Sequence, residues 1–375
     1  MTAHQRVVVA MLDGLDPAYL DGDTMPVLSA LGDRGTSRIV DAIAPTVTNA
    51  NNAGISCAAW PSEHGITGNS YFDPRTGEAD YMEDAQYLTR PTLLERVTAA
   101  GGKAALLTAK KKTVRLLGNR STLAVAAEEP GAELTDRYGP APDIYSGEIN
   151  HWLWTVAVDL LATHPDLDLL YIHTTDYPMH AWEPGDPRTI GHLAGLDELI
   201  GSAVAAAPDA AFFATADHGM NGKALVYDLF QALANRHAPV RFALSAEKDR
   251  YVKHHRTFGG TAWIWLQHPS DEISVAQVLG ALPGVETVLR REEAASRFHL
   301  NPDRIGDLIV LGDRDTVFGE LPPGHESERL PEDYRSHGSL YEQKVPLFAF
   351  NNTEYPYTRP PTHNKDLLAP LLEVW

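Results

Sequence analysis

Short apolar runs alternate with amphipathic segments along most of this chain. The apolar runs have the length of buried strands and are rich in Val, Leu, Ile, Phe and Ala; they cover residues 7–12, 103–109, 167–172 and 210–216. The segments between them show the apolar spacing of helices that bury one face; they include 25–35, 92–102, 147–164 and 192–207. Strands that alternate with helices in this way predict an α/β fold with a mostly parallel central sheet flanked by helices.

The pattern changes in the second half of the chain. The segments TAWIWLQ and GDLIVLGDRDTVFG are rich in β-branched and aromatic residues, and a short helical segment lies between them. We therefore expect residues 245–320 to form a small inserted α+β cap, with 1–244 and 321–375 forming the core. The run VPLFAFNN is expected to return to the core as a late strand. A chain of 375 residues also exceeds the size of about 250–300 at which single hydrophobic cores stop growing.

Aspartates and histidines follow three of the apolar runs. In an open α/β sheet, residues at the carboxyl ends of neighbouring strands meet in one crevice, which is where such folds bind ligands. Carboxylate and neutral imidazole groups are ligands for zinc, manganese or iron, and six of them are enough for two ions. Including one late histidine, the six are Asp13, Asp176, His180, Asp217, His218 and His337. The first hypothesis is therefore a hydrolase with two metal ions.

The segment PTVTNANN supplies a nucleophile for such a centre. A divalent cation lowers the pKa of an oxygen bound to it, from about 16 to about 7 for water on zinc, so an alcohol beside the ions becomes an attacking group. Thr48 is that alcohol, and the small, apolar residues 52–59 after it favour a helix. The N-terminus of a helix stabilises an anion, so a phosphoryl group under attack by Thr48 fits this place.

Several further motifs resemble those of the alkaline phosphatase superfamily. They are DG after the first strand, HGITGN, TTDYPMH, TADHGM and RSHGSLYEQKVPL, and the resemblance extends over nearly the whole chain. Within the superfamily, LLTAKKKTVRLLGN is similar to the TAKxK motif of the phosphonoacetate hydrolase family, a close relative of the nucleotide pyrophosphatase/phosphodiesterases. The resemblance implies a metal-dependent hydrolase that cleaves the C–P bond of phosphonoacetate to acetate and phosphate through a phosphothreonine intermediate.

The resemblance also implies a role for each site residue. Thr48 is the implied nucleophile, and Asn69, at the end of HGITGN, is implied to hold a phosphoryl oxygen. The first metal would be bound by Asp176, His180 and His337, and the second by Asp13, Thr48, Asp217 and His218. Two divalent ions per chain are expected, with Zn²⁺ ahead of Mn²⁺ or Fe²⁺.

The two lysines of the TAKxK motif are implied to bind the substrate, and they fall on Lys110 and Lys112. A small, highly anionic substrate needs local cations here, because the chain has 31 Lys and Arg against 50 Asp and Glu and a net charge of −19. Side chains at i and i+2 share a face on an extended backbone and diverge on a helix, so we expect an extended segment. Lys111 departs from the motif, and this additional cation would broaden anion recognition.

Other interpretations of these residues stay open. Hydrolysis of phosphodiesters, as in the nucleotide pyrophosphatase/phosphodiesterases, or cleavage of a related phosphonate is the main alternative function. The threonine nucleophile and the small cap disfavour a mutase of the superfamily, and the complete ligand set disfavours a non-catalytic binding protein. His254 and His255 lie in the expected cap, where packing or exposure is as plausible as a position over the site. Cys57, in the apolar segment ISCAAW, is expected to pack in the core rather than act as a nucleophile.

Composition limits the partners and the compartment. The chain has one cysteine, which favours a reducing cytoplasm. The N-terminal residues lack a basic leader, and no window has about 18 consecutive apolar residues, so neither secretion nor a membrane span is expected. The acidic net charge and the absence of Lys/Arg-rich tracts disfavour nucleic acid as a partner. We expect a monomer or homodimer that acts on a small anionic phosphonate.

Overall fold

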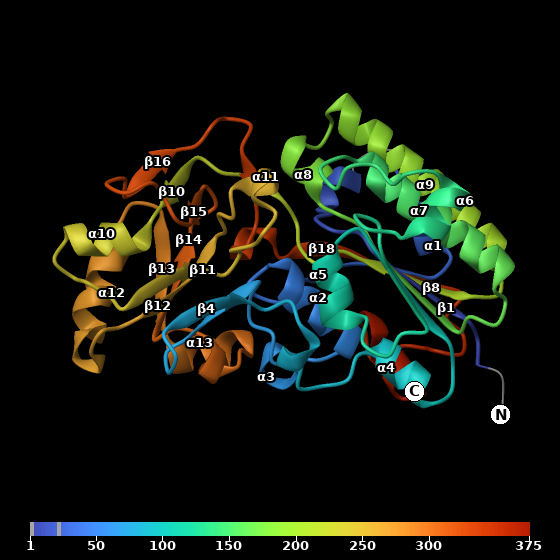
Figure 1. Cartoon of the computed structure of the whole chain (residues 1–375), viewed down its shortest axis with the longest axis horizontal. Coiled ribbons are helices and arrows are strands. Elements are labelled where there is room, and N and C mark those ends of the chain that lie inside the picture. The colour runs from blue at the N-terminus through green and yellow to red at the C-terminus, as the bar shows by residue number, and fades with distance from the viewer. Residues whose placement is uncertain (1–3, 21–23) are drawn as a thin grey trace.

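Two lobes make up the computed structural model, which describes residues 4–20 and 24–375 (Figure 1). The larger lobe is built on a seven-stranded sheet with the order β2-β18-β8-β1-β7-β5-β6. Its strands are β1 (Val7–Met11), β2 (Thr36–Asp41), β5 (Ala104–Thr108), β6 (Leu123–Ala126), β7 (Leu169–His173), β8 (Ala211–Thr215) and β18 (Lys344–Phe350). Six of them run in the same direction, and only β18 is reversed, antiparallel to both of its neighbours β2 and β8. The predicted α/β fold with a mostly parallel sheet is confirmed, although residues 1–3 of the N-terminal segment lie outside the described residues.

The three central strands are almost entirely apolar, and β7 and β8 end in the polar residues His173 and Thr215. Every residue of β1, β7 and β8 is buried, because helices cover both sides of the sheet. Met11 at the end of β1 aligns with His173 in β7 and with Thr215 in β8, so the three strands end at the same level. The residues that follow these ends therefore emerge along one edge of the sheet, as the sequence pattern predicted.

Helices form a layer on each face of the sheet (Figure 1). On one face α9 packs against α1 and α7, and on the other α2, α4 and α5 lie together against the strands. The helices of this lobe are α1 (Pro26–Asp33), α2 (Thr48–Cys57), α3 (Pro61–His64), α4 (Leu93–Ala99), α5 (Lys111–Leu117), α6 (Ala132–Tyr138), α7 (Glu148–Thr163), α8 (Tyr177–Ala181), α9 (Pro187–Ala206) and α14 (Ala369–Leu372). The helix expected from residue 192 begins at Pro187, because Asp186 caps it and proline fits the first helical turn.

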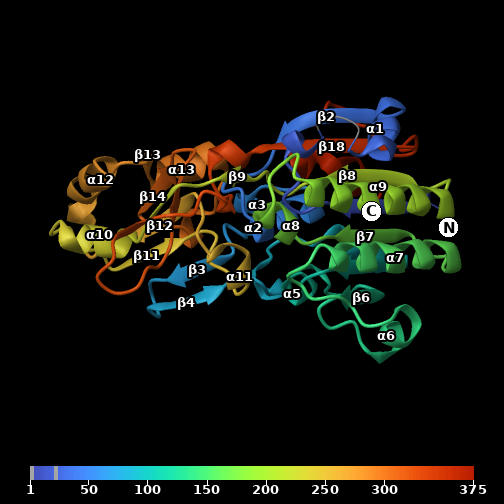
Figure 2. The same cartoon turned by 90° about the horizontal axis from the view of Figure 1, so that it is seen from above.

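The smaller lobe contains two sheets and lies at the opposite end of the molecule from α7 and α9 (Figure 2). One sheet has the order β11-β12-β14-β13 and is antiparallel; the other has the order β15-β10-β16. The elements are β10 (Leu225–Tyr227), α10 (Leu229–Asn235), β11 (Phe242–Ser245), α11 (Val252–His255), β12 (Thr261–Trp265), α12 (Glu272–Gly280), β13 (Val285–Arg290), α13 (Arg291–Phe298), β14 (Leu308–Gly312), β15 (Thr316–Phe318) and β16 (Ser327–Arg329). The expected cap, 245–320, covers the middle of this lobe, and its boundaries stay a prediction.

Two short strand pairs complete the fold. The hairpin of β3 (Ser70–Asp73) and β4 (Glu78–Tyr81) contacts β11 of the smaller lobe. Strand β17 (Arg335–Ser336) pairs with β9 (Asn221–Gly222). Among the residues that the structure describes, none of the helices combines the length and the apolar character that a bilayer span requires.

Candidate active site

The predicted metal ligands come together at the carboxyl end of the central sheet. Asp13 follows β1, Asp176 follows β7 and Asp217 follows β8, and these three strands are neighbours in the sheet. His180 lies on the short helix α8, and His337 follows β17. All five side chains are buried. The apolar strands thus fix where the carboxylates emerge, and the segments after them bring the imidazoles to the same place.

One compact group consists of Asp13, Asp217 and His218, in which a ligand atom of each residue lies within 4.8 Å of the others. His218 Nε2 is 3.3 Å from Asp217 Oδ2 and 3.6 Å from Asp13 Oδ1. The hydroxyl of Thr48 lies 3.4 Å from His218 Nε2. The proposed nucleophile and the second ligand set therefore share one place.

Helix α2 begins at Thr48 itself, four residues before the apolar segment from which the helix was expected. The polar residues of its first turns are satisfied inside the protein: the Asn51 side chain donates hydrogen bonds to the carbonyls of Ile43 and Val47. Cys57, at the other end of the helix, is buried, and burial raises the pKa of its thiol to about 12. Cys57 thus packs in the core as predicted, and the Thr48 hydroxyl stands at the helix N-terminus.

Asp176, His180 and His337 form the adjoining group. His180 Nε2 is 2.9 Å from Asp176 Oδ2, and His337 Nε2 is 3.8 Å from the same oxygen. The rings of His218 and His337 stack with centroids 3.5 Å apart and an interplanar angle of 10°. Because one histidine of each set contacts the other, the two sets lie side by side, which is the arrangement of a two-metal centre.

Hydrogen bonds to the backbone direct Nε2 of each imidazole toward the ligand sets. Nδ1 of His180, His218 and His337 donates to backbone carbonyl oxygens at 2.8, 3.0 and 2.7 Å, respectively, so these partners assign the lone pair to Nε2. Burial, reinforced by the neighbouring histidines, lowers the pKa of His337 well below its ordinary value, and burial also lowers the pKa of His218. Both rings are therefore neutral, as metal ligands must be.

The buried polar atoms of the site fit divalent cations. Asp13 Oδ1, Asp217 Oδ2 and His337 Nε2 have no hydrogen-bond partner among the described residues, and such groups are costly to bury. Burial and the nearby Asp13 raise the pKa of Asp217 well above its ordinary value. Burial and Asp176 would also raise the pKa of Asp13, but the Lys110 ammonium and other neighbours outweigh them and lower it. Oxygen and imidazole donors in this combination suit two transition-metal ions such as zinc.

Lys110 and Lys112 both reach the crevice, with 3% and 2% of the residue exposed. Lys110 Nζ is 2.9 Å from Asp13 Oδ2 and 2.9 Å from Asp176 Oδ1, one carboxylate of each ligand set. The expectation of an extended backbone holds only for Lys110, which precedes α5 with φ −107° and ψ 127°, and is wrong for Lys112, which lies in the helix. Within one continuous helix, side chains at i and i+2 would diverge. Here the backbone changes from extended at Lys110 to helical at Lys112, and this change lets both side chains enter the crevice.

Lys111 points away from the site. It is exposed, and its ammonium lies 2.5 Å from Glu129 Oε2. The first residue of α5 therefore adds no cation to the crevice, contrary to the suggestion that Lys111 broadens anion recognition.

Asn69 lies opposite the lysines with a fixed orientation. Its Oδ1 accepts a hydrogen bond from the backbone N–H of Asn49 in α2, at 2.9 Å. Its Nδ2 group faces Glu247 Oε1 at 3.0 Å and Asp249 Oδ2 at 3.4 Å. The first turn of α2 thus directs the amide N–H groups of Asn69 into the crevice.

Two acidic residues of the smaller lobe enter the site, and the sequence pattern did not single them out. Glu247 and Asp249 lie between β11 and β12 and are buried. Glu247 Oε1 is 3.6 Å from His337 Nε2, and Asp249 forms an ion pair with Lys112. Their segment, SAEKDRY, has the composition of a solvated charged loop, so no local signal distinguishes them.

His254 and His255, which the sequence left open, pack against the first ligand set. The ring of His255 stacks on that of His180 with centroids 4.6 Å apart, and a nitrogen of each of His180, His255 and His337 lies within 4.8 Å of the other two. His254 Nε2 lies 3.3 Å from Thr175 Oγ1. A further histidine that sequence reasoning missed is His173, whose Nε2 lies 3.1 Å from Asp13 Oδ2 and orients that carboxylate.

A mostly parallel sheet that gathers two sets of candidate metal ligands beside an alcohol and buried ammonium groups is the framework of a hydrolase of the alkaline phosphatase type. The sequence identifies the family within this class. Residues 7–340 match the family described as type I phosphodiesterase / nucleotide pyrophosphatase, and the chain belongs to it. The chain is therefore a hydrolase of this family.

Solved structures extend the relationship. Phosphonoacetate hydrolase from Sinorhizobium meliloti 1021 in complex with phosphonoacetate is 31% identical with a TM-score of 0.86, and the match covers 97% of this chain and 94% of that one. Its complex with phosphonoformate gives 32% identity and a TM-score of 0.85, with the same coverage of 97% and 94%. Human ectonucleotide pyrophosphatase / phosphodiesterase 5, at 17% identity, a TM-score of 0.71 and coverage of 99% and 94%, shares the fold. The predicted resemblance to phosphonoacetate hydrolase is confirmed.

Proposed function

We propose that this chain hydrolyses the C–P bond of phosphonoacetate to acetate and phosphate through a phosphothreonine on Thr48. The observation that carries the proposal is the burial of two ammonium groups in the crevice: Lys110 contacts one carboxylate of each ligand set, and Lys112 pairs with Asp249. A buried ammonium group is costly unless it serves an anionic partner, and an acidic chain needs such groups to attract a polyanion. The relative from S. meliloti, solved with phosphonoacetate, supports this choice of substrate.

Thr48 is proposed as the attacking group and Asn69 as the donor to a phosphoryl oxygen. The N–H groups and dipole of α2 favour the negative charge that develops at Thr48, and the orientation of Asn69 supports its role. One cation would be held by Asp176, His180 and His337, and the other by Asp13, Thr48, Asp217 and His218. When bound, two such ions, with zinc as the first candidate, would neutralise phosphoryl charge and lower the pKa of the Thr48 hydroxyl.

The carbon leaving group explains the need for two lysines. As the Thr48 oxygen bonds to phosphorus and the C–P bond breaks, the electron pair would form a carbanion unless it moves into the neighbouring carboxylate. The resulting enediolate takes up a proton at carbon and becomes acetate. Lys110 and Lys112 provide positive charge for that carboxylate. Water then hydrolyses the phosphothreonine, which releases phosphate and restores Thr48.

Hydrolysis of a phosphodiester is the second candidate, and membership of the type I phosphodiesterase family favours it. A diester carries no carboxylate, and an alkoxide or phenolate leaves without an electron sink. Under this function, the lysines would serve the phosphoryl group alone.

The specificity constant distinguishes the two functions. We expect kcat/KM for phosphate release from phosphonoacetate to exceed that for an aryl phosphodiester when both are measured with the zinc-loaded protein. A clear preference for the diester would replace the proposed function by the second candidate.

A further inference from the structure

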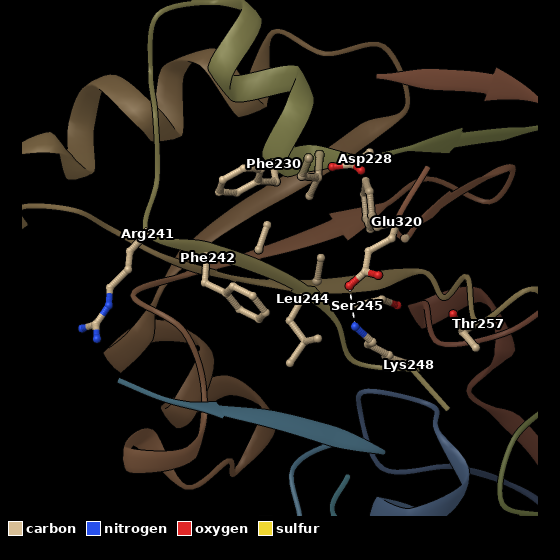
Figure 3. A pocket seen from close by; sticks show the side chains of 14 residues that line it. Asp228, Phe230, Arg241, Phe242, Leu244, Ser245, Lys248, Thr257 and Glu320 are labelled. Carbon is tan, nitrogen blue, oxygen red and sulfur yellow. Dashed lines mark hydrogen bonds and ion pairs between the residues drawn. The ribbon is translucent and has the colours of Figure 1, made fainter. Parts of the chain in front are cut away.

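The loop between β11 and β12 directs successive side chains to opposite sides. Glu247 and Asp249 face the crevice, where they contact Asn69 and Lys112. Lys248, between them, lines a cavity of about 260 Å³ in the smaller lobe and pairs with Glu320 (Figure 3). Two buried carboxylates thus enter a crevice that is proposed to bind a polyanion.

One oxygen of Asp249 contacts two of the three groups proposed to bind the substrate. Asp249 Oδ2 accepts hydrogen bonds from the Lys112 ammonium and, at 3.4 Å, from Asn69 Nδ2. The other oxygen, Oδ1, accepts from the backbone N–H groups of Arg250 at 2.5 Å and Tyr251 at 3.3 Å. The loop therefore holds the carboxylate by one oxygen and presents the other to the substrate-binding donors.

The donors of Asn69 are fully used in this arrangement. An amide nitrogen has two N–H groups, and those of Asn69 face Glu247 and Asp249. A phosphoryl oxygen can accept from Asn69 only after one of these carboxylates leaves. We propose that Asp249 is an internal counter-anion that occupies the place of substrate oxygens at Asn69 and Lys112 and is displaced when a phosphonate binds. This inference rests on the proposed function, which assigns both donors to the substrate.

The surroundings favour displacement of Asp249 rather than of another acidic group. Five buried carboxylates share the crevice with two lysines, and an arriving dianion adds to the repulsion among them; the carboxylates are those of Asp13, Asp176, Asp217, Glu247 and Asp249. Asp249 and Glu247 sit on a loop, whereas the first three follow strand ends. Of the two loop residues, Asp249 pairs with Lys112, whereas Glu247 faces His255 and His337. The cavity behind the loop is lined by Ser245, Lys248 and Thr257 and gives the loop room to move (Figure 3).

Displacement makes Asp249 a determinant of specificity. A ligand must provide at least the charge of a carboxylate to take its place on Lys112, so dianionic and trianionic phosphonates compete well and monoanionic ligands compete poorly. If Asp249 instead served to position Lys112 for the substrate, its charge would strengthen binding. The two roles predict opposite effects of neutralising this side chain.

Calorimetric titration of the metal-loaded protein with phosphonoformate and with inorganic phosphate tests the inference. Asp249→Asn keeps the shape of the side chain and removes its charge, and we expect it to bind both ligands about tenfold more tightly, the equivalent of one hydrogen bond to a charged group. The control Asp315→Asn removes the same charge from an exposed position of the smaller lobe and should leave both affinities unchanged. Equal or weaker binding by Asp249→Asn would overturn the inference.

Hydrogen exchange of the wild-type protein provides a test that needs no variant. The amides of Arg250 and Tyr251 lose their acceptor when Asp249 moves, so the peptide that contains them should exchange faster with saturating phosphonoformate. Unchanged or slower exchange would contradict displacement. Tighter phosphate binding by Asp249→Asn without any cleavage of phosphonoacetate would reject the proposed substrate and retain Asp249 as a counter-anion. Cleavage of phosphonoacetate without tighter phosphate binding by Asp249→Asn would retain the proposed substrate and reject Asp249 as a counter-anion.

Discussion

Replacing Lys112 by Met is expected to impair cleavage of phosphonoacetate selectively. The Lys112 side chain is 2% exposed, and its proposed partner is a carboxylate that gains charge as the C–P bond breaks. Loss of one charge-stabilising donor in such a site costs about 2–4 kcal/mol of transition-state stabilisation. Since about 1.4 kcal/mol corresponds to a factor of ten, kcat/KM should fall roughly 30- to 1000-fold. Lys110 is less suitable, because it contacts Asp13 and Asp176 directly and its loss disturbs both ligand sets.

The assay compares phosphonoacetate with an aryl phosphodiester. The diester has no carboxylate, so Lys112→Met should change its kcat/KM by less than about threefold, or about 0.7 kcal/mol. Lys111→Met is the matched control: the neighbouring lysine is exposed and paired with Glu129, and such surface pairs contribute little. Because Lys112→Met leaves Asp249 without its ion-pair partner, the double variant Lys112→Met/Asp249→Asn separates catalysis from stability. Equal losses on both substrates in correctly folded, metal-loaded protein would refute this role of Lys112.

Three further predictions concern the nucleophile, the metals and pH. Thr48→Ala should lower kcat by about 10⁴–10⁶ while elemental analysis still finds two ions per chain; retention of about a tenth of the activity would exclude Thr48 as nucleophile. A chelator should abolish activity and zinc should restore it with about two ions per chain, and full activity with a single tightly bound ion would contradict the two-metal centre. Burial lowers the pKa of His64 to about 3, whereas the unfolded chain has an ordinary histidine pKa of about 6.5. Between these two pH values the unfolded chain binds a proton that the folded protein does not. The free energy of unfolding should therefore fall by up to about 1.4 kcal/mol for each pH unit between about pH 6.5 and about pH 3. In urea denaturation, His64→Gln should flatten this dependence, and the exposed-site control His237→Gln should not.

The strands and the metal ligands could be predicted because they are encoded locally. Each of β1, β7 and β8 is a short, fully buried and mainly apolar run, and its length fixes where the following aspartate emerges. Topology then places the three ends side by side, so Asp13, Asp176 and Asp217 converge without any information beyond the order of strands and helices. The strand β18 was also expected, but its antiparallel direction has no signature in the run VPLFAFNN.

The contribution of the smaller lobe could not be predicted, because burial of its acidic loop is a tertiary effect. Ala246 in this loop accepts a hydrogen bond from the backbone N–H of Asn69 at 2.8 Å, and this contact brings Glu247 and Asp249 into the crevice. The two partners are far apart in sequence, and the loop itself has the charged composition of a surface segment. The backbone conformation at Lys112 was predicted wrongly because α5 already begins at Lys111. An apolar strand followed by three lysines does not specify the residue at which the next helix begins.

Identification of the products formed from phosphonoacetate tests the proposed function most directly. Proton and phosphorus NMR of phosphonoacetate incubated with the zinc-loaded protein should show acetate and inorganic phosphate appearing in equal amounts, and neither should form with Thr48→Ala. Phosphonoacetate that remains intact while the same preparation hydrolyses an aryl phosphodiester would contradict the assignment of this site to C–P bond cleavage.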